Sequence, residues 1–326
     1  MHATRYAISL AARYGGKLYA AHVISPDALA LAHPEALDRI LKETNDYTEC
    51  TLDELLAPVR RQGLPCEALV GVGDITNVLG EFVEKYKADL VIVGTSGRAG
   101  LGKAFLGSVA EEIIRDAACP VLTVGTNAAG MTAQDIERIL CAIDFSRESL
   151  RAAEYAFFLA QEHNAHLALL HVVEGSTQEP PSHAVQLLSQ ALREVVSFHP
   201  QLSYEPEIVV RGGRVADRIL EFAAERSAHV IVMGVRGVGA FASQASRLGS
   251  IAHEVISRSP CPVLTTSAGN GNYAPRTPYS CHFRLPKRKL HRVQEAKYAS
   301  VMFRFRRFLL FVGSPSSARI RGNYCR

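Results

Sequence analysis

The sequence predicts two consecutive α/β domains, each built on a parallel sheet with helices on both sides. The first observation behind this prediction is an internal repeat of three blocks in the same order. These blocks are 6–24 with 155–173, 70–94 with 210–234, and 106–124 with 248–266. The second is that short apolar runs alternate with amphipathic stretches, as βαβ units require. The repeat sets the boundaries, namely a first domain at 1–126, a linker at 127–136, a second domain at 137–268 and a tail at 269–326.

The strands and helices of each copy follow from apolar spacing. The runs "DLVIVG" at 89–94 and "HVIVMG" at 229–234 indicate strands buried on both faces. Between 214 and 226, Val215, Ile219 and Phe222 recur at helical spacing and predict a helix with one apolar face. Right-handed crossovers between such strands give a parallel sheet, whose ligands bind at the carboxyl ends of the strands.

The first strand is present in the second copy alone. Residues 138–143 predict this strand, Asp144 follows it, and Ser146 is placed to cap the next helix. Met1 aligns with Leu150, so we expect the first domain to lack its first strand. We interpret this as a natural start upstream of Met1 or as a truncated gene. An absent central strand would leave buried backbone groups unpaired, each costing about 1–3 kcal/mol.

A glycine-rich loop at 94–109 has two interpretations. Gly97, Gly102 and Lys103 fit the G-x4-G-K spacing of phosphate-cleaving NTPases. However, Ala104 stands where that loop needs Ser or Thr for Mg²⁺, and the second copy has no lysine here. We therefore interpret Lys103 as an exposed surface charge.

The second interpretation uses the spacing G-x2-G-x9-G-S, whose glycines turn the chain and whose last two residues open a helix. The helix N-terminus then attracts phosphate oxygens through free N–H groups and its dipole. The residues are Gly94, Gly97, Gly107 and Ser108 in the first copy and Gly234, Gly237, Gly249 and Ser250 in the second. The second spacing is two residues longer, so we expect Gly249 to matter less than Gly107 for binding. A purely structural turn before a helix is the alternative.

These loops, with "CPVL" after each, "LHVV" at 170–173 and "AIDFS" at 142–146, resemble the universal stress protein family. The resemblance covers 1–126 and 137–268 and implies two adenine-nucleotide α-hydrolase-like (Rossmann-like) domains of about five strands. It also implies ATP binding, with or without Mg²⁺. Asp144 would lie near adenine and ribose, Val23 and Val172 would line the base pocket, and the loop residues would hold the phosphates.

The function implied is that of a stress-response regulator that binds adenine nucleotide with little or no hydrolysis. No residue pattern marks a catalytic or metal site, and His22/His171 and His253 with Glu254 are interpreted as structural or surface residues. The alternatives are a nucleotide-independent interaction module, or a nucleotide-dependent transferase on a related fold. The last strands, "PVLTV" at 120–124 and "PVLTT" at 262–266, are predicted to meet in an internal pseudo-dimer, with a homodimer as a further level.

The positive charge of the chain is concentrated in the tail. The formal charge is +4, but residues 269–326 contain 13 Lys and Arg and one acid, so the rest of the chain is acidic. We expect this tail to be disordered and dispensable. Any binding to nucleic acid or anionic membrane would be confined to it. Seven cysteines without a CxxC pair indicate reduced thiols and, with no apolar run of membrane-spanning length and no signal peptide, a cytoplasmic protein.

Overall fold

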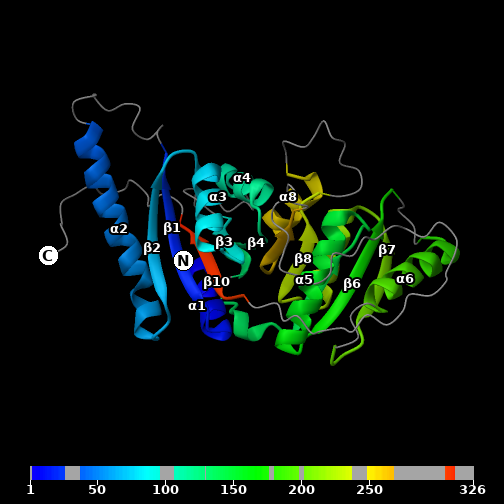
Figure 1. Ribbon diagram of the computed structural model, residues 1–326. Coiled ribbons are helices and arrows are strands. Elements are labelled where there is room, and N and C mark those ends of the chain that lie inside the picture. Colours follow the sequence, from blue (N-terminus) through cyan, green and yellow to red (C-terminus); the bar gives the residue numbers. More distant parts are fainter. Residues whose placement is uncertain are drawn as a thin grey trace, which may run out of the picture.

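The computed structural model describes residues 2–25, 37–95, 106–128, 130–175, 180–197, 202–236, 248–267 and 305–312. Two α/β halves share one ten-stranded sheet with the order β2-β1-β10-β3-β4-β9-β8-β5-β6-β7 (Figure 1). Each half has the same five-strand order, and all pairs within a half are parallel. The predicted α/β fold with tandem parallel sheets is therefore confirmed.

The first half contains four helices and four strands from the first part of the chain. They are α1 (His2–Tyr14), β1 (Lys17–Ile24), α2 (Leu37–Arg61), β2 (Cys66–Val72), α3 (Ile75–Tyr86), β3 (Leu90–Gly94), α4 (Ser108–Asp116) and β4 (Val121–Val124). Two short 3-10 helices, η3 (Thr126–Ala128) and η4 (Ala133–Asp135), lead to the second half.

The second half repeats the pattern with a complete set of five strands. Its elements are β5 (Arg138–Ala142), α5 (Arg147–His163), β6 (His166–Val173), α6 (Ser182–Ser197), β7 (Glu207–Gly212), α7 (Val215–Glu225), β8 (Val230–Gly234), α8 (Ser250–Arg258) and β9 (Val263–Thr266). Local signals set the helix ends. Ser146 caps α5 by accepting from the Ser149 N–H at 3.2 Å, and Asn164 ends α5 in the left-handed conformation.

Helices cover both faces of the sheet, which makes three layers. One apolar cluster packs α1, α2, α5 and α6 on one face, and the other packs α3, α4, α7 and α8 on the opposite face. Alternate residues of β1 divide between them, so that Leu18 and Ala20 join the first cluster while Tyr19 and Ala21 join the second. Strands buried on both faces therefore read as continuous apolar runs in the sequence.

The tenth strand, β10 (Arg307–Phe311), comes from the tail and occupies the position expected to be empty. It lies between β1 and β3, parallel to both, and appears in red between the blue and cyan strands of Figure 1. In the second half, β5 holds the equivalent place between β6 and β8. The side chains of Phe308, Leu309 and Leu310 are at most 1% exposed.

This strand corrects two sequence-based expectations. The first domain does not lack a first strand in space, because β10 supplies its backbone partners. The expectation of a disordered tail is wrong for Phe305–Val312, since these residues form part of the central sheet, and we now expect them to be needed for stability. The physical reason is that the gap between β1 and β3 exposes two rows of hydrogen-bonding groups and apolar surface, which an apolar extended segment satisfies.

The two halves meet at an antiparallel pair formed by β4 and β9, as predicted for the internal pseudo-dimer. The contact is reciprocal. The Thr123 hydroxyl donates to the Val263 carbonyl at 3.0 Å, and the Thr265 hydroxyl donates to the Val121 carbonyl at 3.2 Å. Both hydroxyls are buried, and their bonds satisfy polar groups that would otherwise be costly there.

Helices α1 and α5 also touch across this pseudo-two-fold. The hydroxyl of Tyr14 is 2.8 Å from Nε2 of His163, and the two residues occupy the same position in the repeat. Burial, with a smaller contribution from the charge of Arg13, lowers the pKa of His163 to about 4. The imidazole is therefore neutral at neutral pH.

This histidine predicts a pH dependence of stability. Because its folded pKa lies below the unfolded value of about 6.5, the unfolded state binds the extra proton between those values. We expect its contribution, at most about 3 kcal/mol, to be complete above pH ~6.5 and lost as pH falls towards ~4. His163→Gln should remove this rise, so that the free energy of unfolding in urea, measured against pH, has a less positive or more negative slope than in the wild type over this range. Glu154, whose pKa burial raises to about 7, contributes the opposite slope equally in both proteins. Parallel slopes for the two proteins would contradict the prediction.

Four of the described cysteines, Cys66, Cys119, Cys141 and Cys261, are free thiols, and three of these are buried. Cys50 is disulfide-bonded, which departs from the expectation that every thiol is reduced. In the part of the chain that the structure describes, no helix is long and apolar enough to cross a membrane.

Candidate functional site

The predicted nucleotide residues gather at the carboxyl edge of each half of the sheet. Gly94 and Gly234 are the last residues of β3 and β8, and each lies beside the central strand of its half, β10 or β5. The strand order changes direction at β5, because β6 lies on one side of it and β8 on the other, and β10 holds the equivalent place between β1 and β3. This is the position where open parallel sheets bind ligands.

Two helices begin at this edge without a side-chain cap. Gly107 and Gly249 are the N-cap residues of α4 and α8, and neither helix has a capping side-chain hydrogen bond. Each glycine donates its own N–H to a backbone carbonyl just after the preceding strand. Gly107 donates to the Thr95 carbonyl at 3.3 Å, and Gly249 donates to the Val235 carbonyl at 3.2 Å. Helix N-termini of this kind carry partial positive charge and N–H groups suited to phosphate oxygens.

Both serines that follow these glycines are exposed. Ser108 and Ser250 are the first helical residues of α4 and α8. At this position a serine hydroxyl can act as an additional donor for an anion bound at the helix N-terminus. The arrangement is the same in both halves.

Asp144 follows β5 and is held by its own turn. Its Oδ1 accepts from the Ser146 N–H at 3.0 Å, and its N–H donates to the Ser149 hydroxyl at 3.3 Å. Phe145, between them, has a left-handed φ of 64°, which is uncommon for an aromatic residue. Its ring packs against His171 with centroids 5.2 Å apart. A backbone outlier held by several contacts is typical of functional turns.

The repeated histidines fix the ends of the central strands. His171 Nδ1 lies 2.7 Å from the Ile143 carbonyl, and His22 Nδ1 lies 2.8 Å from the Val312 carbonyl. A carbonyl only accepts, so each imidazole carries its proton on Nδ1. Burial lowers the pKa of His22, which favours its neutral form. The interpretation of this pair as structural strand-end residues is confirmed by these bonds.

The valines predicted for the base pocket lie next to these histidines near the strand ends. Val23 in β1 is buried, and Val172 in β6 is partly exposed. In the second half, Val172 and Asp144 therefore lie at the same edge of the sheet, on the neighbouring strands β6 and β5. In the first half, the residue after Val312 and the loop residues Gly97 and Lys103 lie outside the described residues, as does Gly237 in the second.

The two halves differ in the space around their glycines. A Cβ on Gly234 would lie 2.8 Å from Cβ of Glu148, because the first turn of α5 packs closely on the end of β8. Among the described residues, a Cβ on Gly94 would meet Ala3 alone, at 3.8 Å. As far as these residues define it, the end of β3 has more room than the end of β8.

The space around the two N-cap glycines also differs between the halves, and this difference predicts unequal effects of substitution on stability. A Cβ on Gly249 would lie 2.7 Å from the Val235 carbonyl oxygen, whereas one on Gly107 would lie 3.9 Å from that of Thr95. We expect Gly249→Ala to lower the free energy of unfolding by about 1–3 kcal/mol, because backbone must shift. Gly107→Ala should change it by less than about 1 kcal/mol. Equal losses in urea denaturation would show that the clearance is not limiting.

The polar helix face proposed for His253 and Glu254 is seen directly for Glu254. Its carboxylate pairs with Arg214 and Arg258 on the outside of α7 and α8, and Arg214 chiefly holds the pKa of Glu254 below its usual range. Among the described residues, no group of three or more His, Cys, Asp and Glu side chains could hold a metal ion.

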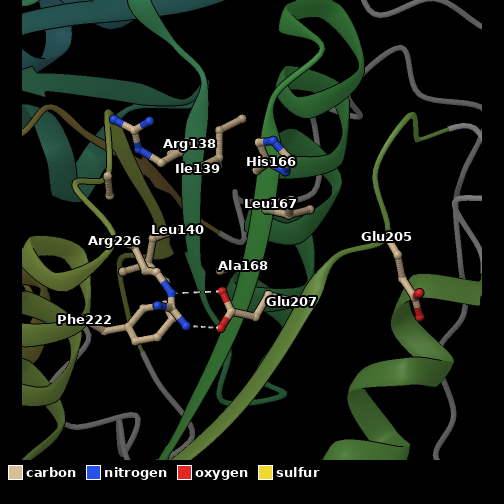
Figure 2. A pocket seen from close by; sticks show the side chains of 11 residues that line it. Arg138, Ile139, Leu140, His166, Leu167, Ala168, Glu205, Glu207, Phe222 and Arg226 are labelled. Atoms are coloured by element: carbon tan, nitrogen blue, oxygen red, sulfur yellow. Dashed lines mark hydrogen bonds and ion pairs between the residues drawn. The ribbon is translucent and has the colours of Figure 1, made fainter.

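A cavity of about 240 Å³ lies at the other edge of the second half (Figure 2). Arg138 and His166, the first residues of β5 and β6, line it, together with Phe222 and the ion-paired Glu207 and Arg226. It contains none of the predicted nucleotide residues. Because it opens at the amino ends of the strands, we do not assign the nucleotide to it.

Sequence reasoning missed the contribution of β10 to the first site. The signal was present, since Arg307–Val312 reads "RFLLFV" and Arg138–Ile143 reads "RILCAI". The register confirms the equivalence, because Arg307 faces Lys17 as Arg138 faces His166. Residues 307–312 are therefore the equivalent of 138–143, although they follow the second half in the sequence.

Comparison with known proteins decides the family. The model of the universal stress protein family matches residues 1–125 and 135–267. The chain belongs to the universal stress protein family. A universal stress protein of Methanocaldococcus jannaschii is 34% identical over 128 residues, which cover 38% of this chain and 74% of that protein. One from Mycobacterium bovis is 28% identical over 187 residues, covering 55% of this chain and 61% of that protein.

Solved structures of the universal stress protein family share the fold. A universal stress protein from Archaeoglobus fulgidus matches with a TM-score of 0.63 and 24% identity, over 82% of this chain and 94% of that one. A putative universal stress protein from Pseudomonas aeruginosa matches with a TM-score of 0.51 and 20% identity, over 78% and 95%. At these identities the likeness establishes the fold of the two halves.

Proposed function

We propose that this universal stress protein is a stress-response regulator that binds ATP, with or without Mg²⁺, at the carboxyl edge of its sheet. The observation that carries the proposal is the pair of uncapped helix N-termini at Gly107 and Gly249, each hydrogen-bonded to the residue that follows β3 or β8, the neighbours of the central strands. Phosphates would bind there, with the base towards the ends of β1 and β6. A cytoplasmic location and regulation without catalysis belong to the same proposal.

The proposed lack of rapid hydrolysis rests on the engagement of Asp144. Phosphoryl transfer needs a placed base or water-orienting group and cations on the phosphates. The Asp144 carboxylate accepts a hydrogen bond from its own turn, at Ser146. This supports a role in binding a hydroxyl group, such as that of a ribose, over one in removing a proton.

The two sites are proposed to be unequal. The second has Asp144 in place beside β5, while its loop is two residues longer. The first has the shorter loop, and its strand next to β1 and β3 is supplied by β10. We therefore expect two classes of affinity, and not two equivalent sites.

Calorimetric titration of the full chain with ATP tests the proposal. Gly107→Leu should weaken the first site at least about tenfold, because a side chain would stand at the helix N-terminus where the phosphate binds. Lys103→Ala is the matched control and should change binding by less than about 1 kcal/mol, as expected for an exposed charge. The reverse result, in which Lys103→Ala abolishes binding and Gly107→Leu is silent, would favour a phosphate-cleaving loop.

Two further outcomes separate the alternative functions. No heat and no thermal shift with ATP would favour the nucleotide-independent interaction module. Rapid release of phosphate, or consumption of ATP only with a second substrate, would contradict the proposed regulator and favour an enzyme.

A further inference from the structure

We propose that the first domain is a strand receptor. In this view the gap between β1 and β3 binds an extended parallel segment reversibly, its ligand is the protein's own C-terminal strand β10, and docking completes the first nucleotide site. Completion of the nucleotide site rests on the proposed function, whereas the strand-binding activity does not. The receptor is assigned from three fixed features along the gap.

The amino end of the gap carries a carboxylate anchor. Asp89 Oδ2 accepts from the backbone N–H groups of both Arg306 and Arg307, each at 2.9 Å. The backbone continues the match, because Lys17 N–H donates to the Arg306 carbonyl at 2.7 Å and Asp89 N–H donates to that of Arg307 at 2.9 Å. Because both donors are backbone N–H groups, this carboxylate fixes where the segment begins without selecting its side chains.

Beside this anchor, the gap is shaped for an aromatic ring. A Cβ on Gly16 would lie 2.5 Å from the ring of Phe308 and 2.9 Å from the Arg306 carbonyl oxygen. The repeat places Ala165 at the same position in the second half, where the strand equivalent carries Ile139 in place of Phe308. Gly16 therefore makes the space that the larger side chain needs, and Phe308 is fully buried there.

The carboxyl end of the gap closes on the last described residue of the segment. Val312 donates its N–H to the Ala21 carbonyl at 2.8 Å, and its own carbonyl accepts from His22 Nδ1 at 2.8 Å. Recognition thus combines main-chain bonds on both sides with buried side chains, which is the physical basis of strand addition in peptide recognition.

The strand β10 is synthesised after the strands that flank the gap. Residues 305–312 follow every other described residue in the chain, and the His22 to Val312 bond joins positions 290 residues apart. The gap between β1 and β3 is therefore filled by a segment that reaches it separately from its two walls. A receptor that is filled in this way is suited to exchange of its occupant.

Docking of β10 affects the first nucleotide site because the strand separates its two sides. Val23 lies on β1 and Gly94 ends β3, and β10 fixes their spacing at two strand widths, about 9–10 Å. If β10 leaves, β1 and β3 either lose their common partner or approach each other. In both cases the base side and the phosphate side no longer face one ligand. Nucleotide and strand should then favour each other's binding.

The test starts from the full-length folded protein, which is then cleaved between the second half and β10. A protease site is inserted at 285–290, and the purified full chain is cleaved under native but reducing conditions, so that no disulfide from Cys50 can hold the fragment. We expect the C-terminal fragment to co-elute with the rest and to exchange with an excess of labelled peptide covering 303–314. A Leu309→Asp peptide is the matched control and should bind at least about 100-fold more weakly. A fragment that separates at once, or that never exchanges with the peptide, would overturn the receptor.

A variant pair tests the shape of the gap, and ATP tests the coupling. Gly16→Ala should weaken the wild-type peptide at least about tenfold and should be partly rescued by a Phe308→Ile peptide. Equal binding of both peptides by both receptors would contradict the assigned fit. ATP should slow fragment exchange. If exchange occurs and ATP leaves its rate unchanged, the strand receptor stands and the nucleotide coupling is wrong.

Discussion

Replacing Phe308 with alanine is expected to lower the free energy of unfolding by about 3–5 kcal/mol, the usual cost of truncating a buried phenylalanine. Phe308 is fully buried in the apolar cluster under α1. Its ring lies 6.1 Å from that of Tyr14 and 6.2 Å from that of Phe305, between ring centroids. The loss is measured by urea denaturation of the full chain.

Arg306→Ala is the control for this prediction. The Arg306 side chain is exposed, and alanine keeps the backbone groups that bind Lys17 and Asp89. Its unfolding free energy should stay within about 0.5 kcal/mol of the wild-type value. Wild-type stability of Phe308→Ala would mean that β10 does not occupy the sheet in solution.

The second large effect is expected at the junction of the two halves. Leu264 and Leu122 face each other at the centre of the β4–β9 pair, and both are buried in one apolar cluster. Leu264→Asp would place a carboxylate there without a cation, and an unpaired buried charge costs about 3–5 kcal/mol. Urea unfolding should shift to lower concentration, and it should separate into two transitions if the halves unfold independently.

Leu264→Ile provides the matched comparison at this junction. It keeps the apolar volume and should cost less than about 1.5 kcal/mol. An aspartate variant as stable as the isoleucine variant would show that β4 and β9 do not pair in solution. Because Leu264→Asp leaves the glycines of both loops in place, any loss of ATP binding would report the loss of the shared sheet.

The sequence alone was enough to predict the α/β class, the two halves and their meeting at β4 and β9. These features come from local signals. Apolar runs such as 89–94 mark strands buried on both faces, Ser146 marks a helix start, and the repeat shows which blocks correspond. The glycine positions at the strand ends and at the starts of α4 and α8 were predicted in the same way.

The tertiary structure alone decided where residues 307–311 pack and how much room the described glycines have. Strand β10 has only five residues, and its partners β1 and β3 lie far from it in the sequence. No local sequence signal therefore identifies this pairing. Its place follows from long-range pairing that satisfies two open rows of backbone groups and buries Phe308. Likewise, Gly107 and Gly249 occupy matching positions in the sequence, but the distance to the facing carbonyl separates them. Both results depend on how distant segments pack, which local propensity does not encode.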